Sequence, residues 1–233
     1  SCKNSLIVNS TFDVGDDGIC IKSGKDADGR KRGIPCENVI VSGCTVFKGH
    51  GGFVVGSEMS GGVKNILVSD CQFLGTDVGL RFKSARGRGG VVENIYIRNT
   101  SMSDIQTDAI TFDLFYGGKS VSEALADGDH ARQKDVPALK VDETTPCFRN
   151  IFIKHVVCRT ANRAAYFNGL PEMPVSNVQL DDVDINNAKE GIVLNRTEGI
   201  TLTNVKVKAT THTLDAKNSK GLTVNGKKYN KVD

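Results

Sequence analysis

Two adjacent aspartates, Asp16 and Asp17, lie between Gly15 and Gly18 in the stretch STFDVGDDGICIKSG. A turn alone would explain this composition, because Asp bonds to its own backbone and Gly accepts a positive φ. Two carboxylates that face one groove can also hydrolyse a glycosidic bond, one as the acid that protonates the leaving oxygen and one as the base that activates water. Repulsion between the two charges would then raise the pKa of one carboxyl and keep that acid protonated.

Three further side chains suit the same chemistry. His50, in the stretch GHGGFVV, is either a surface histidine between flexible glycines or a group that tunes the proton of the acid. Arg81 and Lys83, in the stretch DVGLRFK, would singly be ordinary solvated charges. Beside carboxylates they suit an anionic sugar, since an arginine can bind a carboxylate through two parallel hydrogen bonds.

The elements that must position these residues form a repeat. Six segments share a charged or small residue, then an asparagine, then a β-branched strand: KNSLIVNSTF, ENVIVSGCTV, KNILVSDCQF, ENIYIRNTSM, RNIFIKHVVC and SNVQLDDVDI. Their asparagines are Asn4, Asn38, Asn65, Asn94, Asn150 and Asn177, and Gly199 and Gly221 continue the series. We expect the first four of these asparagines to stack at equivalent turns.

A second motif follows each of the six segments and keeps the same period. Its small central residue falls at Gly18, Gly52, Gly79, Ala109, Ala164 and Gly191. Most intervals lie between 22 and 34 residues, which is typical of a solenoid whose coils bury their faces against their neighbours. The leucine pattern of leucine-rich repeats is missing. The sequence therefore predicts an all-β fold, a right-handed parallel β-helix, in one domain over residues 1–233.

One interval is about twice as long as the others, near 55 residues. It contains either an unrecognised coil or an insertion. The segment 116–146 is polar and does not repeat, so we expect a long loop inserted into one coil. Long loops in compact proteins are usually functional.

The alternation of the second motif assigns its side chains to the inside or the outside of each coil. The two isoleucines of DDGICIK point inwards, which places Asp16 outside. His50 precedes its small residue by two positions, as Asp16 does, so these side chains should stack one coil apart. Arg81 and Lys83 lie outside on the next coil. Strict alternation would bury Asp17, but the flanking glycines allow the backbone to twist until both carboxylates face one groove.

Composition limits the other classes of function. The net charge of +3 is compatible with a polyanionic partner, but no dense basic stripe with interleaved aromatics indicates nucleic acid. No apolar run approaches the ~20 residues that cross a bilayer, so we predict no membrane partner. The seven cysteines lack the paired short spacings of a zinc site. We interpret most of them as buried thiols, with Cys44 and Cys71 stacked in successive coils; one or two disulfide bridges remain an alternative.

The motifs GDD (15–17), GHG (49–51) and RFK (81–83), in this order on successive coils, resemble those of the polygalacturonases of glycoside hydrolase family 28. The last family motif usually reads Arg-Ile-Lys, and Phe82 replaces its inward isoleucine here. The stretches VVGSEMSGGVKNI and RGRGGVVENI are similar to those of bacterial, often exo-acting, members. The resemblance covers essentially the whole chain.

The resemblance implies inverting hydrolysis of α-1,4-galacturonosyl linkages in pectin, with no metal or other cofactor. It makes Asp16 the proton donor and Asp17 one of two carboxylates that activate water, with His50 as the support of the donor. The implied contacts to the substrate are Arg81, Lys83 and Tyr116, the last at the head of the long loop. The implied partner is an acidic polysaccharide, and the implied location is secreted or periplasmic.

The sequence departs from the family in one respect. The family carries a further aspartate in an Asn-Thr-Asp motif about one coil before the GDD, and no such motif occurs here. We therefore expect the C-terminal portion of a larger enzyme, in which water activation would rest on Asp17. The first coil, near Cys2, Leu6 and Val8, should then be covered by an N-terminal segment, by another copy of the chain or by a substitute cap.

Two alternative functions stay open. A pectate lyase shares the fold and the acidic polymer, but its calcium site needs more clustered carboxylates than the outward face offers. A truncated β-helix that binds acidic polysaccharide without turnover would keep the same motifs. Lyase products absorb in the ultraviolet, whereas binding without release of reducing ends would indicate the protein that only binds.

Overall fold

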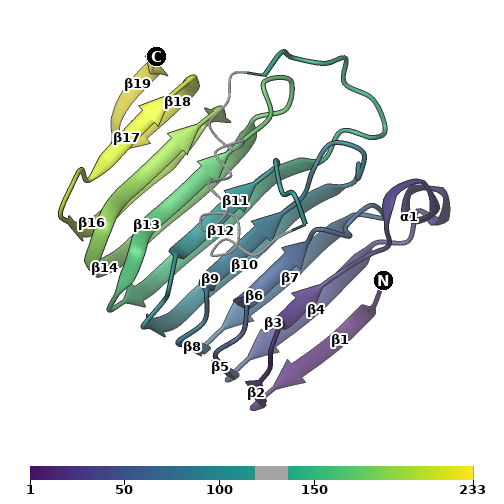
Figure 1. Ribbon diagram of the computed structural model, residues 1–233, viewed down its shortest axis with the longest axis horizontal. Coiled ribbons are helices and arrows are strands. Elements are labelled where there is room, and N and C mark those ends of the chain that lie inside the picture. Colours follow the sequence, from purple (N-terminus) through teal and green to yellow (C-terminus); the bar gives the residue numbers. More distant parts are fainter. Residues whose placement is uncertain (119–135, 233) are drawn as a thin grey trace.

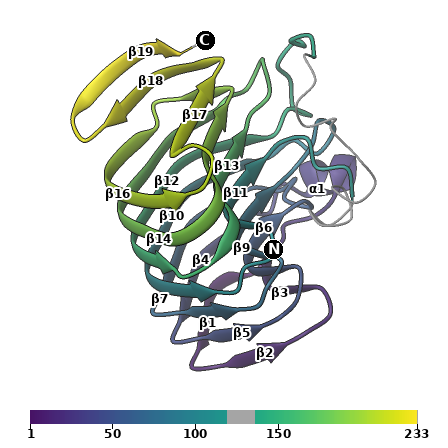
Figure 2. The same cartoon turned by 60° about the vertical axis from the view of Figure 1, so that its left-hand side comes forward.

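The structure is a computed structural model that describes residues 1–118 and 136–232, and these residues form 19 strands and one short helix. The chain winds into a right-handed parallel β-helix, as predicted. Figures 1 and 2 show its coils stacked in sequence order, from the purple N-terminal end to the yellow C-terminal end. Apart from the last hairpin, every pair of neighbouring strands is parallel, because each coil brings the chain back in the same direction.

Each coil contributes strands to stacks that run along the axis. The first stack contains β1 (Lys3–Val8), β4 (Cys36–Ser42), β7 (Val63–Ser69), β10 (Val91–Ser103), β12 (Cys147–Cys158), β14 (Val175–Asn195), β15 (Thr197–Glu198), β16 (Thr201–Ala209) and β18 (Ser219–Val224). The short second stack contains β2 (Thr11–Asp13), β5 (Thr45–Phe47) and β8 (Gln72–Leu74). The third, which we call the site stack, contains β3 (Asp17–Ile21), β6 (Gly51–Gly56), β9 (Val78–Lys83), β11 (Asp108–Asp113), β13 (Ala161–Asn168), the end of β14, and β17 (Leu214–Lys217).

A column of asparagines holds the register of the first stack. The members Asn4, Asn38, Asn65, Asn94, Asn150 and Asn177 all have φ between 48° and 57°. This left-handed region is open mainly to glycine and asparagine. The amide of Asn38 donates to Asn4 Oδ1 at 3.0 Å, and the amide of Asn65 donates to Asn38 Oδ1 at 3.2 Å. The predicted stack is confirmed, and Gly199 and Gly221 continue it with φ of 67° and 62°.

Columns of similar side chains fill the interior. The rings of Phe82 and Phe112 stack with centroids 4.5 Å apart, and those of Phe112 and Phe167 with centroids 4.7 Å apart. These spacings match the ~4.8 Å between neighbouring strands, so ring stacking and strand pairing stabilise the same register. Cys44 and Cys71 are buried on consecutive coils, as predicted. All seven cysteines are free thiols, which excludes the disulfide alternative in this structure.

The long interval of the repeat is an insertion. β10 pairs directly with β12, and β11 pairs directly with β13, so no further coil lies between them. The predicted loop 116–146 falls at this point, although its residues 119–135 lie outside the described part. Its later portion is anchored to the connection between β9 and β10, because the amides of Gly87 and Gly89 both donate to the carbonyl of Thr144.

Two elements depart from the regular repeat. The helix α1 (Asp26–Arg32) lies between β3 and β4 and ends at Gly33, whose φ of 59° closes it. At the other end β19 (Lys227–Val232) pairs antiparallel with β18. The connecting turn is Asn225-Gly226, and both residues have positive φ, as the tight turn of a hairpin requires. Across residues 1–118 and 136–232 no helix has the length and apolar character needed to span a membrane.

Candidate active site

Two strands of the site stack, β3 and β9, carry Asp17, Arg81 and Lys83, while Asp16 and His50 immediately precede β3 and the intervening β6. The inward side chains of β3, β6 and β9 are Ile19, Ile21, Phe53, Val55, Leu80 and Phe82, all of them buried in the core. The predicted inward positions are therefore confirmed. Strict alternation would place Gly18, Gly52 and Gly79 outside, and that is wrong, because a Cβ on them would meet the core residues Val46, Phe73 and Met102. Cys20, Val54 and Arg81 form the outward column that lies between the two inward columns.

Asp16 and His50 meet across one coil, as predicted. The backbone amide of His50 donates to the carbonyl of Asp16 at 2.9 Å, and His50 Nδ1 lies 3.0 Å from Asp16 Oδ1. The same carboxylate oxygen accepts a hydrogen bond of 2.8 Å from the amide of Asp17. The side chain of Asp16 is 82% exposed, so its carboxylate is fixed on one side and open to a ligand on the other.

The hydrogen bonds of Asp16 lower its pKa. The amide of Asp17 has the largest effect, partial burial opposes it, and the contact with His50 lowers the pKa further. We expected repulsion between the paired carboxylates to raise the pKa of the proton donor. That expectation is wrong for Asp16 in the free protein, because its neighbours stabilise the charged form.

Asp17 lies in a buried ionic cluster. Lys83 Nζ is 2.6 Å from Asp17 Oδ2, and Arg81 Nη1 is 3.6 Å from Asp17 Oδ1. The side chains of Asp17 and Lys83 are each 7% exposed and that of Arg81 is 1% exposed. Taken singly in the sequence, Arg81 and Lys83 would be ordinary solvated charges. In the structure both are buried, and each lies beside the carboxylate of Asp17. Burial, followed by the repulsion of Arg81, lowers the pKa of Lys83.

The start of the insertion returns to this cluster. The ring centroid of Tyr116 lies 5.5 Å from Arg81 Cζ and 5.0 Å from Lys83 Nζ, within the range of a cation–π contact. The amide of Tyr116 donates to the carbonyl of Ser84, which fixes the tyrosine beside β9. Burial raises the pKa of its phenol, so the hydroxyl is a neutral donor. The structure thus brings all six predicted site residues together.

A family model confirms the family that these motifs suggested. The model of glycosyl hydrolases family 28 matches residues 1–145. The chain belongs to this family. It is 27% identical over 186 residues to a probable polygalacturonase of Vitis vinifera, a match that covers 79% of this chain and 34% of that protein. It is 34% identical over 114 residues to an exo-poly-alpha-D-galacturonosidase of Dickeya chrysanthemi, covering 49% and 19% respectively.

Solved structures of family 28 share the fold. A hyperthermoactive exopolygalacturonase from Thermotoga maritima superimposes with a TM-score of 0.63 at 26% identity, covering 98% of this chain and 43% of that one. A family 28 exopolygalacturonase of Yersinia enterocolitica gives 0.69 at 23% identity, covering 94% and 37%. The chain therefore spans less than half the length of each of these relatives.

Two residues beside the candidate site were missed in the sequence. Cys20 Sγ lies 3.7 Å from Asp17 Oδ2 and 3.4 Å from the carbonyl of Gly56, and burial raises the pKa of this thiol to about 12. Glu58 forms an ion pair of 3.1 Å with Lys22 at the edge of the site. The outward parity of Cys20 was visible in the alternation. The contact of Glu58 depends on the path of the chain after β6, for which the sequence holds no periodic signal.

Proposed function

We propose that this chain carries the catalytic face of a polygalacturonase-like glycoside hydrolase, which cleaves α-1,4-galacturonosyl linkages of pectin or polygalacturonate with inversion. Family membership and relatives with polygalacturonase names support the proposal. The observation that carries it is the pairing of two adjacent carboxylates in opposite surroundings. Asp16 is exposed beside His50, and Asp17 is buried against Lys83.

In the proposed reaction Asp16 acts as the acid. Its O–H bond breaks as the proton passes to the glycosidic oxygen, and the bond from that oxygen to the anomeric carbon breaks. The low pKa of Asp16 in the free protein means that the proton must be taken up when substrate binds. A saccharide that covers the exposed carboxylate and brings its own negative charge would raise the pKa of Asp16 in the complex. His50 holds the carboxylate in place meanwhile.

Asp17 acts as the base. It accepts a proton from a water molecule, whose oxygen forms the new bond to the anomeric carbon from the opposite face of the sugar. Both protons are then exchanged with solvent, which restores the starting state. Lys83 holds the carboxylate of Asp17 in position, because its ammonium lies 2.6 Å from Asp17 Oδ2.

Arg81, Lys83 and Tyr116 form the proposed binding face for the acidic saccharide. The cations attract carboxylates of the substrate, and the Tyr116 hydroxyl offers a neutral donor beside them. A polysaccharide substrate of the plant cell wall lies outside the bacterial or plant cell, so we propose a secreted or periplasmic protein.

The replacement Asp16→Asn tests the function. It retains the shape of the side chain but removes the proton, and general acid catalysis contributes roughly 10²–10⁴-fold. We expect the release of reducing ends from polygalacturonate to fall by that factor, with little change in affinity. The control is Asp13→Asn, which makes the same replacement at an exposed aspartate of the same coil.

Three results would contradict the proposal in different ways. Activity of Asp16→Asn within a few fold of the parent would exclude Asp16 as the acid. Products that absorb in the ultraviolet would identify a lyase. Binding of oligogalacturonate by the parent chain without release of reducing ends would identify a protein that only binds the polysaccharide.

A further inference from the structure

A nucleophilic side chain inside the candidate site takes no part in the proposed reaction. Cys20 follows Asp17 by three positions on β3 and points outwards, in register with Val54 and Arg81 of the next two coils. Its Sγ lies 3.7 Å from Asp17 Oδ2 and 3.4 Å from the carbonyl oxygen of Gly56 on β6. A thiol is a weak donor with one proton, and either oxygen can accept it. The thiol therefore connects two coils at the carboxylate of Asp17.

The thiol of Cys20 stays protonated at neutral pH. Burial, followed by the negative charge of Asp17, raises its pKa to about 12. A group with this pKa holds its proton in almost every molecule at neutral pH. A protonated thiol is a poor nucleophile, but it can donate a hydrogen bond. Cys20 is therefore a neutral donor beside a carboxylate and not a reactive group.

Two donors of different kinds converge on Asp17 Oδ2. Lys83 Nζ, 2.6 Å away, belongs to a long side chain two coils distant. In the proposed reaction this ammonium also attracts carboxylates of the substrate. Cys20 lies on the same strand as Asp17, and a single side-chain dihedral places its sulfur. The contact of Cys20 with Asp17 is therefore set by β3 itself and persists when the ammonium turns towards a ligand.

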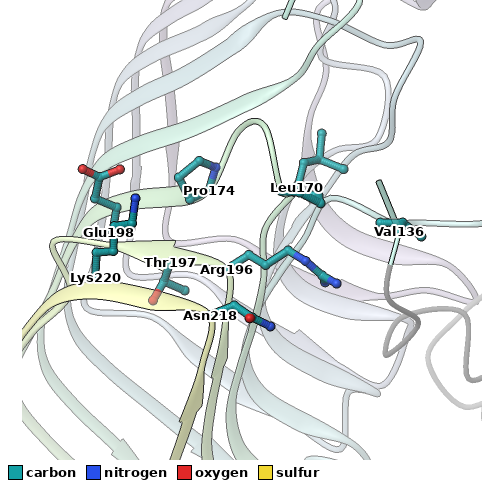
Figure 3. A pocket seen from close by; sticks show the side chains of 9 residues that line it. Val136, Leu170, Pro174, Arg196, Thr197, Glu198, Asn218 and Lys220 are labelled. Atoms are coloured by element: carbon teal, nitrogen blue, oxygen red, sulfur yellow. The ribbon is translucent and has the colours of Figure 1, made fainter. Parts of the chain in front are cut away.

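The hollow shown in Figure 3 is separate from this contact. Its volume is about 380 Å³, and its walls include Leu170, Arg196 and Asn218, which lie several coils beyond β3. Neither Cys20 nor Asp17 lines it. The effect of Cys20 must therefore come from its contact with the carboxylate and not from a place in the wall of that hollow.

We propose that Cys20 is a positioning residue, whose thiol orients the carboxylate of Asp17 for its role as the base. This inference rests on the proposed function. In the productive state the proton of the thiol points to Asp17 Oδ2, which it reaches from the carbonyl of Gly56 by rotation about the Cβ–Sγ bond. The base must meet the water molecule at a defined angle. A small error in the orientation of Asp17 therefore lowers turnover without weakening the binding of substrate.

Three replacements in the full chain separate the donor from the bulk of the side chain. Cys20→Ser retains a donor, Cys20→Val retains apolar bulk without a donor, and Cys20→Ala retains neither. With polygalacturonate, kcat for the release of reducing ends should fall roughly three- to tenfold in the valine and alanine variants, as the loss of one hydrogen bond predicts. The serine variant should stay within about twofold of the parent. KM should change by less than about twofold in all three, because Arg81, Lys83 and Tyr116 remain.

The matched control is Cys158→Ala. Cys158 is also a buried thiol, burial likewise raises its pKa to about 12, and its Sγ lies 3.4 Å from the carbonyl oxygen of Thr160. It belongs to β12 in the first stack and does not contact Asp17. The kcat of this variant, measured per mole of folded protein, should equal that of the parent. Thermal melting shows the folded fraction of every variant.

Alkylation gives a second measurement that does not depend on turnover. With iodoacetamide at neutral pH, peptide mass spectrometry of the native chain should show Cys20 labelled at least ~100-fold more slowly than the exposed Cys2, because little thiolate is present. In the denatured chain the two rates should be similar. Equal rates in the native chain would show a thiolate at Cys20, which cannot donate a hydrogen bond, and would overturn the inference.

Turnover decides the other outcomes. Equal kcat in the parent and in Cys20→Ala would overturn the role of Cys20 and leave the proposed function intact. A serine variant no better than the valine variant would show that the donor is not what matters, which also overturns the role. An increase in KM with unchanged kcat would place Cys20 in substrate binding instead. Absence of hydrolysis by the parent would refute the proposed function, and this inference with it.

Discussion

Lys83 Nζ lies 2.6 Å from Asp17 Oδ2, although the two residues are 66 positions apart and their strands are separated by a further coil. Gly51 lies on the intervening strand β6, beside this contact. A Cβ there would lie 2.5 Å from a methyl of Val54, whereas its 3.6 Å from Asp17 Oδ1 would be an ordinary contact. The second glycine of the GHG motif is thus required by the close approach of Val54, next to an ion pair that spans three coils.

Loss of Lys83 should destabilise the fold. Lys83→Met would leave the buried carboxylate of Asp17 with only the more distant Arg81, and breaking a buried pair typically costs ~3–5 kcal/mol. We expect urea denaturation to show a decrease at the lower end of that range. The double variant Lys83→Met with Asp17→Leu should recover part of the loss, since neither charge remains. A single variant as stable as the parent would show that Asp17 does not depend on this pair.

Arg81 should matter for binding. Arg81→Gln removes a charge-assisted contact worth ~1.5–3 kcal/mol, so affinity for oligogalacturonate should fall by about an order of magnitude or more and depend less on salt. Calorimetry at two salt concentrations measures both effects. The control is Arg98→Gln on the first stack, where the arginine is exposed. Unchanged affinity in Arg81→Gln would place the substrate elsewhere.

The pKa of Asp16 should reflect the hydrogen bonds that its carboxylate forms with its neighbours. Its folded pKa is lowered chiefly by the amide of Asp17 and then by His50. A lowered carboxyl pKa stabilises the fold above the ordinary pKa of aspartate, and this contribution disappears as the pH falls through the folded pKa. NMR titration should show the pKa of Asp16 below its usual range, and His50→Ala should move it part of the way back. A pKa at or above the usual value in the parent would contradict the structure.

The asparagine column should tolerate glycine better than alanine. Asn65 has φ of 57°, accepts a hydrogen bond from Asn94 and donates one to Asn38. Asn65→Gly loses these bonds, each worth about 1 kcal/mol. Asn65→Ala loses them and adds about 1–2 kcal/mol for the left-handed backbone. Thermal or urea unfolding of the two variants measures the difference, and an alanine variant as stable as the glycine variant would refute this explanation of the column.

The repeat was predictable because each of its causes is local. Alternation places Ile19 inside and Asp16 outside, and asparagine is one of the few residues that accept the left-handed turn of each coil. The same reasoning should have found a second left-handed column, in which Asn9 and Asn99 take part with φ of 48° and 51°. It was missed because its members are chemically more varied, and glycine, aspartate and histidine also occur there.

The interior of the site was not predictable in the same way. Arg81 and Lys83 are buried because other parts of the folded chain cover them. The pKa of Asp16 is lowered chiefly because the backbone amide of Asp17 points at its carboxylate. Neither follows from spacing along the chain. The antiparallel β19 had a sequence signal in the Asn-Gly turn that precedes it, and this signal was missed.

The direct pairing of β10 with β12 has an architectural consequence. The chain leaves the solenoid after Asp113 and re-enters it at Cys147, yet the strands on either side keep their register. The number of residues in a coil therefore does not change how its strands pair. The stacked asparagines and interior side chains align the strands, whatever the length of chain between them. Tyr116, at the start of this excursion, stays fixed beside β9 through the carbonyl of Ser84. A change in chain length beyond Tyr116 would therefore leave in place the strands that carry Asp17, Arg81 and Lys83.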